Sequence, residues 1–144
     1  MRTPQGGSGT LARDDVTMLV EKLVARWAAK DTAAVSKLFA DRVRWWTAAV
    51  PGVPWPTRVR TPREVESFFL AFRSTLELTG VTTHGLVVDR SDAVLMGRLH
   101  TRVQATGATL SFDFAMAVSA HAGRIAEFRL YADTLAIARA VAVR

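Results

Sequence analysis

Residues 123–134 read GRIAEFRLYADT, and this stretch decides how the chain folds toward its end. A glycine break opens it, a β-rich run follows over 124–132, and Asp133 stands directly before the helix-forming run 134–143. An aspartate at this place can accept hydrogen bonds from the first free N–H groups of a helix. The stretch therefore predicts a strand that passes directly into a closing helix.

Three further β-rich runs precede this strand, at residues 81–89, 93–105 and 109–120. The breaks between them are short, and short connections favour antiparallel neighbours, so the runs predict a meander. A fifth strand-like segment lies at 42–47 and is followed by a proline-rich loop.

The first half of the chain carries helical patterns. Apolar residues recur at helical spacing over 14–30, and Asp31 can cap a short second helix. Thr61 and Glu64 form a capping box around a proline at the first helical position, and Gly80 is the expected end of that helix.

Helices followed by an antiparallel sheet indicate an α+β fold. Residues 1–13 are predicted to form a flexible N-terminal tail, and residues 14–144 a single domain. A long sheet that bends over its own helices encloses a cavity that is open at one end.

Composition narrows the class of protein. Hydrophobic residues make up 49% of the 144 residues, enough for a sizeable core, and no apolar run approaches the ~20 residues of a membrane span. The absence of cysteine excludes disulfides and thiolate sites and fits a cytoplasmic protein. Three scattered histidines make no zinc site, and His84 and His121 are expected to face solvent.

The net charge of +6 raises the question of nucleic acid. The arginines are spread along the chain, whereas a nucleic-acid module concentrates its charge. The densest group, Arg58, Arg60 and Arg63 near Trp55, is predicted to be a solvated loop. The pattern argues against nucleic acid and leaves acidic small molecules open as ligands.

The order of elements resembles the nuclear transport factor 2-like superfamily, and in particular its SnoaL-like polyketide cyclases, ketosteroid isomerases and limonene-1,2-epoxide hydrolases. The resemblance is carried by residues 43–47 with the following loop and helix, by residues 97–100, and by residues 123–134 with their Gly-Arg-Ile and Tyr-x-Asp pattern. It implies a cone-shaped curved sheet wrapped around the N-terminal helices, a hydrophobic small-molecule ligand, no cofactor, and a homodimer formed through the outer face of the sheet.

The resemblance also implies catalytic residues. Residues two apart in a strand share a face, so Arg98 and His100 should point the same way, as should Tyr131 and Asp133. If the likeness holds, these side chains meet inside the cone. Asp133 or His100 would then remove a proton next to a carbonyl, and Arg98 or Tyr131 would stabilise the enolate.

Structural roles compete with these catalytic ones. Asp133 can serve only as a helix cap. Arg98 can pair with Asp113 on the neighbouring strand. Tyr131 can be core.

An apolar pocket is predicted beside the catalytic set. One of Trp45 and Trp46 must face inward by strand alternation. The residues expected to contact a flat ligand are Trp45, Thr47, Trp55 as a lid at the mouth, Phe112, Phe114 and Met116.

The epoxide hydrolases carry an Arg-x-Asp pair and a Tyr-x-Asn pair. Here Arg98 matches the Arg of the first pair, but His100 stands in place of its Asp. Trp45 and Thr47 stand in place of the Tyr and Asn of the second pair. These replacements weaken the case for hydrolysis.

These observations favour a SnoaL-like enzyme that uses cofactor-free acid–base catalysis as a cyclase, isomerase or dehydratase. One alternative is an epoxide hydrolase with His100 as the acid and Asp133 as the base. Another is a non-catalytic ligand-binding or dimeric adaptor domain, which a packed interior without a cavity would favour.

Overall fold

The computed structural model describes residues 4–142 and has the predicted α+β architecture. In chain order its elements are α1 (Pro4–Ala28), α2 (Thr32–Ser36), β1 (Phe39–Thr47), α3 (Pro62–Thr75), β2 (Leu76–Asp89), β3 (Asp92–Val103), β4 (Thr109–His121), β5 (Arg124–Ala132) and α4 (Thr134–Ala142).

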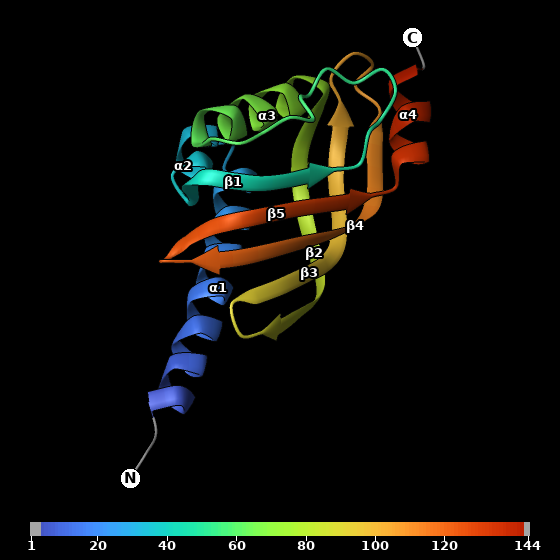
Figure 1. Ribbon diagram of the computed structural model, residues 1–144. Coiled ribbons are helices and arrows are strands. Elements are labelled where there is room, and N and C mark those ends of the chain that lie inside the picture. Colours follow the sequence, from blue (N-terminus) through green and yellow to red (C-terminus); the bar gives the residue numbers. More distant parts are fainter. Residues whose placement is uncertain (1–3, 143–144) are drawn as a thin grey trace.

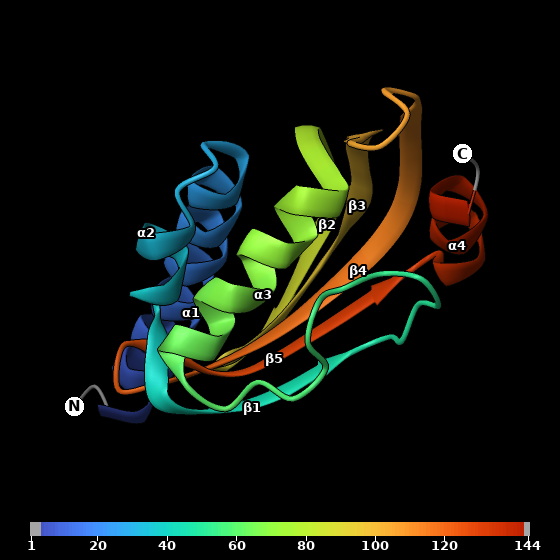
Figure 2. The ribbon, with the colours of Figure 1, turned by 90° about the horizontal axis from the view of Figure 1, so that it is seen from above.

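The five strands form one curved sheet in the order β1-β5-β4-β3-β2. β2 to β5 are the predicted antiparallel meander, but β1 runs parallel to β5. No hairpin joins β1 to β5, so nothing local fixes their relative direction. Helices α1, α2 and α3 lie on the concave side of the sheet (Figures 1 and 2).

Alternation along each strand separates a buried face from an outer face. On β3 the buried side chains that face the helices include Leu95, Leu99 and Val103. The alternate residues, among them Met96, Arg98 and His100, point to the side of the sheet away from α1–α3, which is called the outer face below. Rings of α3, β1 and β5, among them Phe69 and Phe128, pack together between the sheet and the helices.

The predicted helix starts are confirmed. Asp31 accepts a hydrogen bond from the backbone nitrogen of Ala34 at 3.0 Å and so caps α2. Thr61 caps α3, because its hydroxyl oxygen accepts from the backbone nitrogen of Glu64 at 3.3 Å. These caps satisfy N–H groups that a helix cannot pair internally.

Two boundaries differ from the prediction. The N-terminal helix begins at Pro4, so residues 4–13 are helical, whereas a flexible tail was predicted; residues 1–3 lie outside the described range. Once a packed helix has formed, adding a turn at its end requires little further ordering. The helix α3 ends at Thr75, and β2 begins at Leu76, so Gly80 lies inside a strand, next to a register shift.

The hairpin between β4 and β5 explains the glycine break that opens the 123–134 stretch. Ala122 and Gly123 both have positive φ, 51° and 76°, as the tight two-residue turns of hairpins require. Among the described helices, none combines the length and apolar character needed to cross a membrane.

Candidate functional site

The structure places Arg98 and His100 on the outer face of the sheet, so the prediction that they meet Asp133 inside the cone is wrong. Arg98 Nη1 donates to Asp113 Oδ1 at 2.9 Å, which confirms the alternative pairing. His100 forms hydrogen bonds with the hydroxyls of Thr82 and Ser111, at 2.7 and 2.8 Å. The prediction chose the wrong face of β3. Leu95, Leu99 and Val103 occupy the inner face, so the alternate positions of Arg98 and His100 face outward.

Asp133 and Tyr131 complete the predicted catalytic set and also lie outside the cone. Asp133 is exposed, and its Oδ1 accepts from the backbone nitrogen of Ala136 at 3.0 Å, so the interpretation as a cap of α4 is confirmed. Tyr131 is 43% exposed and packs on Trp46, with 4.8 Å between ring centroids. The four residues therefore do not form a common site.

The residues predicted to contact a ligand do lie on the inner side of the sheet, although their role toward a ligand stays a prediction. Trp45 faces inward and Trp46 outward, as alternation requires. Phe112, Phe114 and Met116 share one buried strand face.

Trp55 was predicted to be a lid at the mouth, but it is buried and stacks on Phe72, with 5.0 Å between centroids. Burial in the core removes the large apolar surface of the Trp55 ring from water, which favours this position over an exposed lid.

One pocket inside the cone, among residues 4–142, is small. It has a volume of about 20 Å³ and lies between β1, α3 and α4, with Phe68, Phe112 and Ile137 in its wall. The polar side-chain groups of its lining residues are the hydroxyls of Thr47 and Thr134 and the indole N–H of Trp55. The space is close to that of one water molecule and far below that of a polycyclic ligand.

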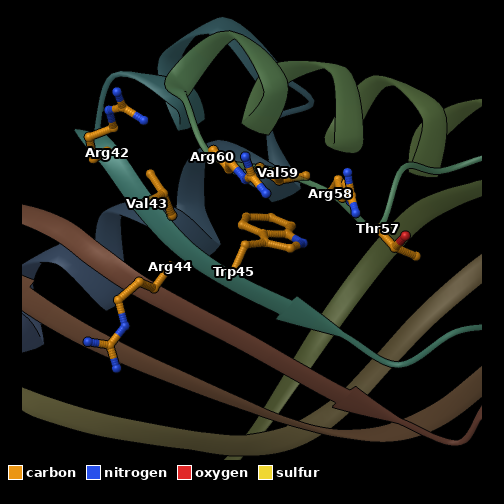
Figure 3. Close-up of a pocket in the computed structure, with 8 residues that line it drawn as sticks. All are labelled: Arg42, Val43, Arg44, Trp45, Thr57, Arg58, Val59 and Arg60. Atoms are coloured by element: carbon orange, nitrogen blue, oxygen red, sulfur yellow. The ribbon is translucent and has the colours of Figure 1, made fainter.

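A larger concavity lies at the free edge of β1. It has a volume of about 500 Å³ and is lined by residues 42–45 and 57–60 (Figure 3). It is called the edge cleft below. One backbone hydrogen bond, from Val43 N to Arg60 O at 2.9 Å, ties the two segments together.

The floor and rim of the edge cleft differ in character. Val43, Trp45 and Val59 supply the apolar floor, and both valines are buried. Arg42, Arg58 and Arg60 are exposed and belong to the rim. Arg58 and Arg60 stand out in the sequence, but the cleft does not, because the two segments that form it lie apart in the chain.

Two polar atoms on the inner face of β1 are buried without a hydrogen-bond partner in the described part of the chain. They are Trp45 Nε1 and Thr47 Oγ1. Trp45 lines the edge cleft, and Thr47 lines the small inner pocket. Both atoms are covered by protein, so neither is reached directly from the open space of the edge cleft.

A third concavity of about 480 Å³ lies between α1 and β2, with His84 and Leu86 in its wall. His84 is exposed, as predicted, and so is His121.

The resolved pKa shifts lie away from the edge cleft. A hydrogen bond from Lys30, with the Lys30 charge, lowers the pKa of Glu77. Hydrogen bonds to Tyr131 and then to Glu127 raise the pKa of Arg129. Within residues 4–142, no three histidine, aspartate or glutamate side chains gather as a metal site would require.

Solved structures define the class of fold. A candidate SnoaL-like polyketide cyclase from Jannaschia sp. CCS1 matches with a TM-score of 0.77 at 15% identity, over 100% of this chain and 98% of that one. An LEH-like epoxide hydrolase from M. tuberculosis matches with a TM-score of 0.69 at 15% identity, over 90% and 91%. An NTF2-like protein from Burkholderia thailandensis E264 matches with a TM-score of 0.74 at 23% identity, over 87% and 95%.

These TM-scores establish a nuclear transport factor 2-like fold, as the sequence predicted. The family follows from the sequence itself. The chain belongs to the SnoaL-like domain family, whose model matches residues 20–128. No curated protein sequence shows significant similarity to the chain.

Proposed function

We propose that this chain is a small-molecule-binding SnoaL-like domain whose ligand occupies the edge cleft. The observation that carries the proposal is an open concavity in which exposed arginines surround an apolar floor of Val43, Trp45 and Val59.

The dimensions and lining of the edge cleft support the same proposal. Its volume of about 500 Å³ falls within the range of small-molecule sites in proteins. The indole of Trp45 and the side chains of Val43 and Val59 offer an apolar surface to the body of a hydrophobic ligand. A flat ligand suits this floor, because aromatic rings favour stacked and edge-on contacts.

Binding without acid–base turnover is the option that the geometry favours over a cyclase, isomerase or dehydratase. Proton transfer requires an acid or base within hydrogen-bond reach of the substrate. The small inner pocket offers two hydroxyls and one indole, and the edge cleft offers guanidinium groups, one indole and one hydroxyl; neither offers a carboxylate or an imidazole. The epoxide hydrolase alternative has the same difficulty, because His100 and Asp133 lie outside both spaces.

Nuclear magnetic resonance tests the proposal through the indole N–H signals. We would titrate ¹⁵N-labelled protein with 2-naphthylmethanol and, separately, with naphthalene-2-carboxylate, and would assign the Trp45 signal by the Trp45→Phe variant. At least one probe should shift the Trp45 indole signal and leave that of Trp46, on the outer face, in place. If neither probe moves the Trp45 signal at millimolar concentration, the proposal fails.

We also propose that the outer face joins two copies of the chain. Apolar side chains are exposed there, including Val94, Met96 and Tyr131. Charges of both signs lie among them, as in the pair of Arg98 with Asp113. A surface with both signs can be complementary to itself, which a two-fold symmetric dimer requires.

A further inference from the structure

We infer that the edge cleft selects a carboxylate attached to a flat apolar body. This inference rests on the proposed small-molecule function and adds the chemical class of the ligand. The structural basis is an excess of hydrogen-bond donors and positive charge around an apolar floor.

The positive charge comes from Arg58 and Arg60, which line the cleft and, within residues 4–142, pair with no carboxylate. Arg42 also lines the cleft, but its side chain points away from Trp45 (Figure 3). Arg44 differs, because its Nη2 lies 3.4 Å from Glu127 Oε1 on the neighbouring strand. Guanidinium groups bind carboxylates through two parallel N–H donors, which gives direction as well as charge.

The backbone of β1 adds a donor. Val43 N donates to Arg60 O, so the N–H of Val43 points away from β5 and toward the free edge. Backbone N–H groups of a strand alternate between its two edges. The N–H of Trp45, two residues later, therefore points to the free edge as well, where residues 57–60 pass alongside β1 in Figure 3.

Trp45 thus turns its backbone N–H toward the cleft, while its indole nitrogen is covered by protein. The eight lining residues include no aspartate or glutamate, and the neighbouring carboxylate of Glu64 accepts hydrogen bonds from Arg60 N at 2.9 Å and from the Thr61 hydroxyl at 3.2 Å. The indole is also the main apolar surface of the cleft. A ligand with an anionic group and a planar body satisfies both features, whereas a bare anion satisfies only the first.

Calorimetric titration of two matched probes tests the inference. Naphthalene-2-carboxylate and 2-naphthylmethanol share the flat body and differ in charge. At about 50 mM NaCl, where screening is weak, the carboxylate should bind at least about tenfold more tightly. The Arg58→Gln/Arg60→Gln variant should lose this preference, and raising the salt concentration should weaken the carboxylate alone.

The matched control is Arg124→Gln/Arg139→Gln, which removes the same charge from exposed positions outside the cleft. It should bind the carboxylate as the unaltered protein does. The Arg58→Lys/Arg60→Lys variant keeps the positive charge and should retain part of the preference for the carboxylate. This result would show that the loss in Arg58→Gln/Arg60→Gln comes from the removed charge and not from misfolding.

The outcomes separate this inference from the proposed function. Equal binding of the two probes would overturn the carboxylate selection and leave a neutral-ligand site standing. Absence of binding by both probes would overturn both proposals. Equal losses in the two Gln variants would reduce the effect to the net charge of the chain and overturn the inference, as would displacement of the carboxylate by inorganic phosphate at equal concentration.

Discussion

At the scale of single residues, Asp133 carries a task that can be measured. Its carboxylate closes the first turn of α4, with Oδ1 3.0 Å from Ala136 N. We expect Asp133→Ala to lower the free energy of unfolding by about 1 kcal/mol, and Asp133→Asn to keep most of it, since asparagine also caps helices. Urea denaturation measures both. A fully stable Asp133→Ala protein that no longer binds its ligand would instead place Asp133 in the site.

Glu77 provides a prediction about pH. Its hydrogen bond to Lys30 lowers its pKa, so the ionised carboxylate stabilises the folded state. This stabilisation is complete above the pKa of an unfolded glutamate and is lost as the pH falls through the lower folded pKa. Glu77→Gln should therefore melt at a lower temperature than the unaltered protein at neutral pH.

The difference between these two melting temperatures should shrink in acid, because both side chains are then neutral. Glu21→Gln, at an exposed position on α1, is the control and should melt like the unaltered protein at both pH values. A Glu77→Gln difference that persists at acid pH would mean that packing rather than charge is involved.

At the scale of elements, Gly97 limits how β3 packs on β2. A Cβ at this position would lie 2.2 Å from the carbonyl oxygen of Thr82, which is backbone and has little freedom to move. We expect Gly97→Ala to cost about 1–3 kcal/mol of stability. Gly85→Ala is the matched control, because its Cβ would meet only the end of Met96 at 3.7 Å, and it should change stability by less than about 0.5 kcal/mol. Thermal melts of the two variants compare them directly, and equal melting temperatures would contradict the expectation.

The elements differ in how far the sequence could predict them. Helix starts depend on three or four adjacent residues, so the caps at Asp31 and Thr61 were predictable from the chain alone. The parallel pairing of β1 with β5 was not, because it joins segments from opposite halves of the chain and no turn fixes it.

The sequence likewise predicted some features of the candidate site and not others. Alternation predicted that Arg98 and His100 share a face, but which face it is depends on the neighbouring strands. The apolar positions Leu95, Leu99 and Val103 carried that information, since they are the ones that need burial. The edge cleft had no comparable signal, because it exists only where two separate segments meet in space.

At the scale of the whole molecule, the outer face predicts the oligomeric state. Val94 and Met96 are 36% and 39% exposed on β3, although both are apolar. Val94→Glu/Met96→Glu should convert a dimer into a monomer, because it would bury like charges against their symmetry copies. Light scattering after size-exclusion chromatography measures the mass. Leu70→Glu, at an exposed position of α3, is the control and should leave the dimer intact. A monomeric unaltered protein would rule the dimer out.

The pairing of β1 with β5 has a consequence for synthesis. On the ribosome, β1 is made before α3 and the strands β2 to β4, and its sheet partner β5 follows only after them. Until β5 is made, the rings of Phe39 and Trp45 lack Phe128, against which both pack in the folded protein. The nascent chain thus carries an unpaired aromatic strand during that interval, and chaperones that bind exposed apolar segments are expected to bind it then.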